Sequence, residues 1–267
     1  MEITEFKQII FDHYLKHGRS FPWRETKDPY AITVSEIMLQ QTQTDRVVPK
    51  YQAFLSALPN WQALSEVNNA ELFTLWQGLG YNRRALSLKK MAQVVVEKYA
   101  GLLPHTQTEL VSLPGIGPYT SGAILAFAFN IPVPVIETNI RRVYIHHFFA
   151  PDSVVSDKDL MPLIEATLDA DNPREWYYAL MDYGSQLAKT LPNPNRRSLH
   201  YVKQGKLAGS NREVRGAILR VLTQHQKLTY QELVNETKIV DDRVAPAYAQ
   251  MLAEGFIIED AGSVALS

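Results

Sequence analysis

The sequence predicts an all-α body of two lobes, followed by a small winged-helix-like α+β domain at the C-terminus. Three observations lead to this prediction. Apolar residues recur at helical spacing along most of residues 1–190. A tight Gly-x-Gly turn at residues 115–117 separates two of these helical stretches. Residues 212–267 differ in kind, because their helical patterns are followed by two short apolar runs around a turn, which favours a β-hairpin.

The helices of the body are expected to follow one another through short connections. In chain order they are predicted over residues 3–17, 30–43, 46–58, 62–66, 70–78, 83–99, 140–149, 157–169 and 173–189. Within 30–43, Thr33 and Glu36 have the spacing of a capping box, which is a common structural use of glutamate.

The helices divide into lobes by their order in the chain. Residues 21–130 are expected to form a six-helix lobe, and residues 1–20 with 138–190 the second lobe. A basic linker at 191–211 would then lead to the winged-helix-like domain at 212–267. Such modules often bind duplex DNA, but this one is acidic, so we expect it to dock or to position a substrate.

The turn between two helices carries the first functional signal. It reads Leu113-Pro114-Gly115-Ile116-Gly117-Pro118-Tyr119-Thr120. The glycines permit a left-handed backbone, and Pro118 suits the first turn of the helix that follows. Unpaired N–H groups at such a turn can hold a phosphate. A Gly-x-Gly alone is weak evidence, because many tight turns contain one.

A carboxylate follows about twenty residues downstream. The segment Pro132-x-Pro134 ends the preceding helix and holds the chain extended. Thr138 is the expected N-cap of a new helix that starts near Ile140. Glu137 would then lie at a helix N-terminus, where the helix dipole favours its ionised form.

Composition excludes several classes of protein. The 267-residue chain is 46% apolar, enough for a sizeable core, and it contains no cysteine, so it has neither disulfides nor thiolate-held zinc or iron–sulfur clusters. It lacks a long apolar run, and its polar start does not resemble a signal peptide. We therefore expect a cytoplasmic protein with no membrane partner and no cofactor.

The net charge of −1 hides a strongly basic segment. Residues 189–220 contain eight lysines and arginines, Lys203 among them, against one acidic residue. Such a density of cations can neutralise several phosphates. An ordinary solvated linker explains the same charges equally well.

Several motifs outside the turn now indicate a family. They read Pro22-Trp23-Arg24, Asp28-Pro29-Tyr30, Ser35-Glu36-Ile37-Met38-Leu39-Gln40-Gln41-Thr42 and Gly78-Leu79-Gly80-Tyr81. With the turn and Glu137, they resemble the helix-hairpin-helix DNA glycosylase superfamily, and within it the MutY-type adenine glycosylases. The resemblance covers roughly residues 5–190. Most relatives carry four cysteines just after the region that here reads Met181-Asp182-Tyr183-Gly184, and this chain has none.

The resemblance implies a set of catalytic residues. Releasing adenine requires a proton for the departing purine and a negative charge near a sugar that becomes oxocarbenium-like. By resemblance, Glu36 is the acid, with a pKa raised by burial, and Glu137 is the stabilising carboxylate. Asn139 would help to hold the sugar, with Tyr119 beside it. The family usually has Asp where this chain has Glu137.

The resemblance also implies DNA contacts. Gln40, Gln41 and Thr42 would enter the duplex, and Tyr81 would contact it. Trp23, Arg24 and Leu39 would line the base pocket. The remaining DNA-binding residues are expected to be Leu113, Gly115, Gly117, Thr120, Arg196 and Arg197. Backbone carbonyls of Leu113, Gly115 and Gly117 would hold a monovalent cation that bridges to a phosphate.

Two departures from the family pattern bear on activity. Bifunctional relatives have a lysine where this chain has Tyr119, so a monofunctional glycosylase without AP-lyase activity is expected. Residues after 211 resemble a winged helix, whereas MutY-type enzymes usually inspect the base opposite adenine with a nucleotide-hydrolase-like domain. Asn82 also replaces a tyrosine that wedges into the duplex in those enzymes.

Three readings of the function remain open. The first is a glycosylase that removes adenine mispaired with 8-oxoguanine or guanine in base-excision repair, acting on double-stranded DNA as a monomer. The second is a glycosylase of the same fold that removes another damaged or mismatched base. The third is a non-catalytic duplex-binding damage sensor, although retention of both carboxylates argues against a decayed pocket.

Overall fold

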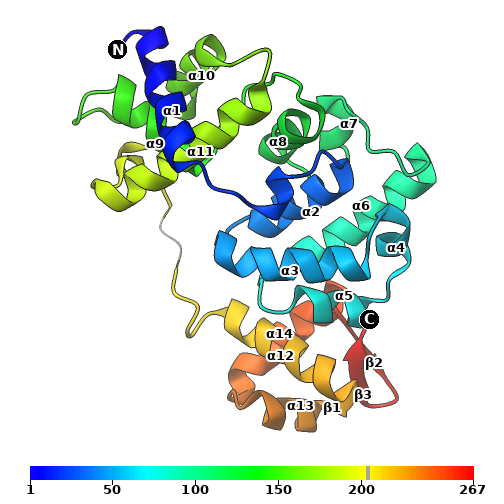
Figure 1. Cartoon of the computed structure of the whole chain (residues 1–267). Helices are drawn as coiled ribbons and strands as arrows, with labels where there is room; N and C mark the ends of the chain where they lie inside the picture. The colour runs from blue at the N-terminus through cyan, green and yellow to red at the C-terminus, as the bar shows by residue number, and fades with distance from the viewer. Residues whose placement is uncertain (203–204) are drawn as a thin grey trace. The chain divides into compact units, whose positions relative to one another are not determined.

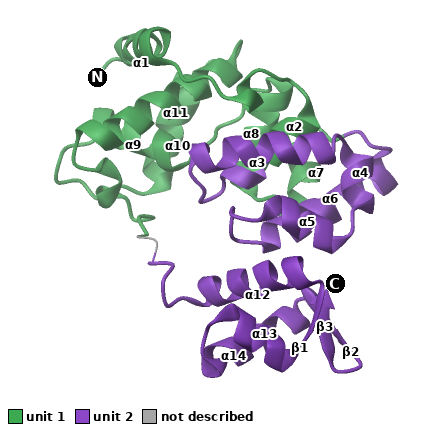
Figure 2. Ribbon diagram, turned by 60° about the horizontal axis from the view of Figure 1, so that its bottom comes forward, with its two compact units in different colours: residues 1–36, 103–203 green, residues 37–102, 204–267 purple. Residues whose placement is uncertain are grey.

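A computed structural model describes residues 1–202 and 205–267 (Figure 1). Lys203, one of the basic residues noted above, lies outside the described residues. The chain forms two compact units, residues 1–36 with 103–203 and residues 37–102 with 204–267 (Figure 2). No helix among the described residues is long and apolar enough to cross a membrane.

The first unit is helical. Its elements are α1 (Ile3–His17), η1 (Pro22–Arg24), most of α2 (Pro29–Leu39), α7 (Gln107–Val111), α8 (Pro118–Phe129), α9 (Thr138–Phe148), α10 (Asp157–Thr167), α11 (Pro173–Thr190) and η2 (Pro194–Arg197). Aromatic rings form its core, since the ring centroid of Phe6 lies 5.2 Å from that of Tyr144 and 6.0 Å from that of Trp176. Residues 120–128 of α8 are all buried, which fixes the hairpin against this core.

The second unit joins two segments distant in sequence. The first segment contains α3 (Thr44–Ala57), α4 (Trp61–Glu66), α5 (Asn69–Trp76) and α6 (Arg83–Tyr99). The second contains α12 (Asn211–His225), β1 (Lys227–Thr229), α13 (Tyr230–Thr237), α14 (Asp241–Ala253), β2 (Ile257–Asp260) and β3 (Ser263–Leu266). The rings of Phe73 and Phe256 stack with centroids 5.5 Å apart, so the C-terminal module packs directly on α5.

The C-terminal module confirms the predicted α+β pattern. Its antiparallel sheet has the order β1-β3-β2, with Ile257 opposite Leu266 and Lys227 opposite Ala265. The strand β1 was not predicted, because its three residues become a strand only through pairing with β3. The fold class predicted from the sequence is therefore confirmed, while the domain boundaries stay a prediction.

Two helix starts differ from the sequence-based expectation. Helix α2 begins at Pro29, where the Asp28 carboxylate accepts hydrogen bonds from the N–H groups of Tyr30 (3.1 Å) and Ala31 (3.3 Å). The capping box that the spacing of Thr33 and Glu36 allowed is therefore not formed, and the Thr33 hydroxyl donates instead to the Pro29 carbonyl. The helix also ends at Leu39, so residues 40–43 are not its last turn.

The N-cap of helix α9 lies one residue earlier than expected. It is Glu137, not Thr138. The longer carboxylate reaches the N–H groups of the first turn, which places a catalytic candidate directly at the positive end of the helix.

Candidate active site

Glu36 lies in the buried run of α2, where residues 31–38 are all buried. Its exposed fraction is 7%, and the Tyr119 hydroxyl donates a hydrogen bond to its Oε2 at 3.3 Å. Desolvation raises the pKa of Glu36 to about 7, and the neighbouring Glu137 contributes in the same direction. The bond from Tyr119 and the charge of Arg24 oppose this shift without cancelling it. At neutral pH this carboxyl group is therefore poised between its acid and its base form.

Tyr119 reaches Glu36 because the hairpin delivers it. Gly115 adopts a φ of +81°, which only glycine adopts without strain, and Pro118 starts α8 directly before Tyr119. Desolvation raises the pKa of the Tyr119 phenol well above its usual range, and the charges of Glu36 and Glu137 raise it further. The hydroxyl therefore stays protonated and acts as a donor.

Glu137 has a different environment. Its Oε1 accepts from the N–H groups of Asn139 (2.7 Å) and Ile140 (2.8 Å), and its Oε2 accepts from the Asn139 side-chain amide (3.3 Å). Desolvation raises the pKa of Glu137 above its usual value, and the two backbone hydrogen bonds and the charges of Arg142 and Arg141 oppose this rise without cancelling it. Donors therefore face both oxygens, which is the arrangement that stabilises a carboxylate.

Asn139 is held in place by Arg142, one turn later in the same helix. Arg142 Nη1 donates to Asn139 Oδ1 at 2.7 Å and to the Gly184 carbonyl at 2.7 Å. A Cβ atom at Gly184 would lie 2.4 Å from the Asn139 carbonyl oxygen. Only glycine therefore allows α11 to pack this closely against the start of α9.

The segment after α11 also supports α9. Asn195 donates to the Thr138 carbonyl at 2.8 Å, and Asn193 Oδ1 accepts from Arg142 Nε at 3.3 Å. Arg197 donates to the carbonyls of Ile145 (2.8 Å) and Phe149 (3.2 Å) at the other end of α9. Sequence reasoning missed the two asparagines, although Asn-Pro-Asn is a recognisable turn signal.

The two arginines predicted to bind DNA differ in their surroundings. The Arg197 guanidinium is occupied by carbonyl groups of the protein, whereas Arg196 is exposed. DNA binding by either one stays a prediction.

The predicted base-pocket residues are divided between the units. Arg24 donates to both oxygens of Asp182, each at 2.8 Å, and its guanidinium carbon lies 4.4 Å from the centroid of the Tyr178 ring. Trp23 is buried and stacks on Phe21 with centroids 5.0 Å apart. Both belong to the unit that contains Glu36, whereas Leu39, at the end of α2, belongs to the second unit. Asp182 was not predicted, because its role depends on partners 158 and 163 residues away.

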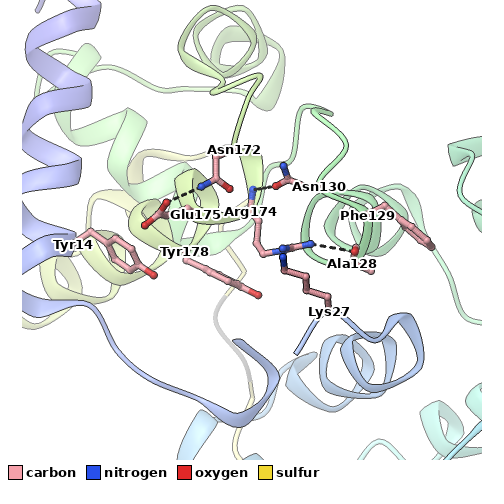
Figure 3. A pocket seen from close by; sticks show the side chains of 9 residues that line it. All are labelled: Tyr14, Lys27, Ala128, Phe129, Asn130, Asn172, Arg174, Glu175 and Tyr178. Carbon is pink, nitrogen blue, oxygen red and sulfur yellow. Dashed lines mark hydrogen bonds between the residues drawn. The ribbon is translucent and has the colours of Figure 1, made fainter. Parts of the chain in front are cut away.

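A pocket of about 580 Å³ lies in the first unit (Figure 3). Arg174, from α11, lines it and donates to the carbonyls of Phe127 (2.6 Å) and Ala128 (3.1 Å) at the end of α8. None of the predicted site residues lines this pocket. Tyr178 lines it, and desolvation raises the pKa of Tyr178, as does the charge of Glu36.

The other predicted DNA contacts fall into two sets. Gln40, Gln41, Thr42 and Tyr81 belong to the second unit, where Gln41 (φ +56°) and Tyr81 (φ +47°) have left-handed backbones. Arg84 holds the C-terminal end of α2 in place, because it donates to the carbonyls of Ile37 (2.8 Å), Met38 (2.9 Å) and Gln40 (2.6 Å). Thr42 is 9% exposed, and its hydroxyl bonds to the Leu79 carbonyl.

The second set belongs to the hairpin in the first unit. Leu113 and Thr120 are buried, and Gly115 is exposed. The Leu113 carbonyl accepts from the N–H of Ile116 (3.2 Å), and the Gly117 carbonyl accepts from that of Ser121 (2.9 Å). A carbonyl oxygen has two lone pairs, so each retains capacity for a second partner.

Comparison with known proteins gives a consistent result. Residues 34–166 match the HhH-GPD superfamily base excision DNA repair protein model. An adenine DNA glycosylase of Buchnera aphidicola subsp. Baizongia pistaciae is 36% identical over 201 residues, 73% of this chain and 56% of the relative. An adenine DNA glycosylase of Mycolicibacterium smegmatis is 34% identical over 222 residues, 76% of this chain and 75% of the relative.

Solved structures agree on the fold. A thermostable thymine-DNA glycosylase is 27% identical with a TM-score of 0.62, covering 68% of this chain and 86% of the other. A non-covalent endonuclease III–DNA complex, 18% identical with a TM-score of 0.54, covers 70% of this chain and 86% of the other and supports the fold alone. The chain spans little more than half the length of the first three curated relatives, 54–57%. The 34% identity over three quarters of both chains in the M. smegmatis relative shows that this chain belongs to the HhH-GPD superfamily and, within it, to the adenine DNA glycosylases.

Proposed function

We propose that this protein is a monofunctional DNA glycosylase that hydrolyses the N-glycosidic bond of adenine mispaired with 8-oxoguanine or guanine. The observation that carries the proposal is the hydrogen bond that the Tyr119 hydroxyl donates to the buried Glu36 carboxyl group. The pKa of Glu36 is raised to about 7 by desolvation, and the charge of Glu137 contributes to this rise. Family membership agrees with it, because relatives matched over 76% and 78% of this chain are named adenine DNA glycosylases.

In the proposed reaction the two carboxyl groups have different tasks. Protonated Glu36 donates its proton to a ring nitrogen of adenine, so the bond to the sugar breaks with its electron pair leaving on a neutral base. Glu137, as a carboxylate, stabilises the positive charge that develops on the sugar. Water then adds to the anomeric carbon and gives its proton to the Glu36 carboxylate, which restores the acid and leaves an abasic site.

Tyr119 supports the absence of AP-lyase activity. Strand cleavage by a bifunctional glycosylase needs an amine that forms a Schiff base with the sugar. A phenol cannot form one, and the Tyr119 hydroxyl bonds to Glu36. The abasic product therefore leaves with an intact strand.

The hairpin is proposed to hold the DNA backbone. The carbonyls of Leu113 and Gly117 each retain a lone pair, and Gly115 is exposed at the turn, which fits a monovalent cation bridging to a phosphate. We further propose that the protein acts as a monomer on double-stranded DNA, in the cytoplasm and associated with the nucleoid, without an iron–sulfur cluster.

A single-turnover excision assay tests the activity. The duplexes carry adenine opposite 8-oxoguanine, guanine or cytosine, and alkaline treatment then reveals abasic sites. Product from adenine opposite 8-oxoguanine or guanine, visible only after alkali, is expected. Product without alkali would contradict the monofunctional assignment, and no excision of adenine from any duplex would overturn the proposed substrate.

A second candidate substrate is thymine mispaired with guanine. The similarity of this chain to the thymine-DNA glycosylase favours this substrate, because the two chains share 27% of their sequence as well as the fold. Thymine and uracil opposite guanine therefore belong in the same panel. Release of thymine but not of adenine would show that thymine mispaired with guanine is the substrate.

A further inference from the structure

A basic cleft of about 600 Å³ lies within the second unit. One wall comes from the loop that joins α5 to α6 and carries Tyr81, and the other comes from the first turns of α12 in the C-terminal module. Both walls belong to one compact unit, and the stacking of Phe73 on Phe256 holds them together.

The charge of this cleft is strongly positive. Five arginines line it, and no acidic side chain is among the described residues that do so; the arginines are Arg46, Arg83, Arg84, Arg212 and Arg215. Behind them, one carboxylate, Glu254, pairs with both Arg83 (2.5 Å) and Arg215 (2.7 Å). The Arg83 side chain is 68% exposed, so it can reach a second anionic partner.

Tyr81 is held at the edge of the cleft by the C-terminal module. Arg212 Nη1 donates to the Tyr81 hydroxyl at 2.5 Å, and the guanidinium carbon lies 5.3 Å from the ring centroid. The φ of +47° at Tyr81 is uncommon for a residue with a side chain. A bulky side chain keeps such a backbone only when its surroundings hold it there, and such strain is concentrated at functional sites.

Amide side chains complete the lining. Gln40 and Gln41 come from the end of α2, and Asn211 donates to Gln250 at 3.0 Å on the side of the C-terminal module. Amides read base edges through paired hydrogen bonds, and arginines bind phosphates. The cleft thus combines groups for a DNA backbone with groups for a base.

We propose that this cleft binds the DNA strand opposite the extruded adenine, and that Arg212 of the C-terminal module sets the preference for the opposite base by positioning Tyr81. Arg83 and Arg46 contact phosphates of that strand. The inference rests on the proposed glycosylase function and adds a site to it. The module after residue 211 is then part of the recognition surface.

Binding measurements separate this inference from the glycosylase activity. Dissociation constants are measured by fluorescence anisotropy on uncleavable duplexes that contain 2′-fluoro-adenosine opposite 8-oxoguanine, guanine or an abasic analogue. If wild type binds these duplexes but releases no adenine from the natural ones, the proposed function fails while the cleft can still be tested.

The two arginines are expected to act differently. Arg83→Ala should weaken binding about 10-fold on every duplex and lower the slope of log Kd against log salt by about 1. Arg212→Ala should reduce the ratio of affinities for 8-oxoguanine over guanine by about 10-fold, the scale of one lost base-reading contact. With the abasic analogue, the Arg212 effect should disappear.

Two further variants act as controls. Lys98→Ala removes an exposed cation from the same helix as Arg83 but outside the cleft, and it should bind like wild type. Tyr81→Phe keeps the ring and removes the acceptor for Arg212, so it should reproduce the loss of preference at unchanged thermal stability. If Arg83→Ala and Arg212→Ala both bind and discriminate like Lys98→Ala, the cleft is not a DNA site.

Discussion

Glu36 and Glu137 are both glutamates, but their carboxyl groups accept hydrogen bonds from different donors. Glu36 lies inside a helix with a single side-chain donor, Tyr119, on its carboxyl group. Glu137 precedes a helix, and two backbone N–H groups and an amide face its oxygens. Desolvation raises the pKa of both groups, but only at Glu137 do backbone hydrogen bonds oppose it. The number of donors at each carboxyl group separates an acid from a charged stabiliser.

The largest expected effect comes from removing the acid. Glu36→Gln keeps the size of the side chain but cannot donate the proton, so single-turnover excision should fall by about 10²–10⁴-fold while DNA binding is preserved. A near-normal excision rate would show that another group supplies the proton.

The same variant should be more stable than wild type in alkaline solution. The folded-state pKa of about 7 lies above the ordinary value of 4.5, so wild type loses stability as pH rises through this interval. Above pH 7, Glu36→Gln should therefore raise the free energy of unfolding by up to about 3 kcal/mol. Urea unfolding at pH 5 and pH 8.5 measures the difference, which should be small at pH 5.

The next effect comes from neutralising the stabiliser. Glu137→Gln retains oxygen and amide but removes the charge, and it should slow excision by about 10²–10³-fold, as loss of electrostatic stabilisation does elsewhere. Glu137→Asp retains the charge and a good N-cap, yet withdraws the carboxylate by one methylene, about 1.5 Å. It should therefore keep its melting temperature and lose up to about 10²-fold in rate. Equal rates for Glu137→Gln and wild type would exclude the electrostatic role.

A smaller effect is expected where the position of α9 is set. Gly184→Ala places a Cβ atom against the Asn139 backbone, so α9 must shift, at a cost of about 1–3 kcal/mol and about 10-fold in excision. Gly216→Ala in α12 is the control for stability, because a Cβ atom there meets no atom within 4 Å. Should both variants melt alike, the close approach of α11 to α9 would have no energetic importance.

The smallest effect is expected from Tyr119→Phe, which should shift the pH dependence of the excision rate. Excision should decline above about pH 7 as Glu36 loses its proton. The hydrogen bond from Tyr119 lowers the pKa of Glu36, so Tyr119→Phe should raise that pKa and move the decline to higher pH. A decline that moves to lower pH, or stays in place, would contradict the contact.

Much of the fold could be predicted because its signals are local. The apolar spacing of α1 and the glycines of the hairpin depend on neighbouring residues, and both appear where expected. The start of α2 was predicted to within one residue, whereas its end was placed four residues too late, at residue 43 instead of Leu39. Thr138 was the predicted N-cap because threonine is favoured there, and only the folded chain shows that Glu137 takes this position.

The rest of the site depends on contacts between distant segments. Asp182 acquires its role by accepting from Arg19 and Arg24, more than 150 residues earlier in the chain. The same holds for Arg212, whose bond to Tyr81 joins residues 131 apart. Such partners are invisible to spacing rules, since no periodicity links them. Residue types at single positions could be predicted from motifs, but the groups that position them could not.

The segment 193–199 has a practical consequence for truncation. A fragment that ends with α11, at Thr190, would contain both candidate catalytic carboxyl groups, Glu36 and Glu137, yet it would lack the bonds from Asn195 to Thr138 and from Arg197 to the end of α9. It would also lose the pairing in which Leu199 donates to the Val155 carbonyl at 3.0 Å. Limited proteolysis should therefore release a long-lived N-terminal core that extends to residue 199 or beyond, because any earlier cleavage would remove contacts that hold α9 in place.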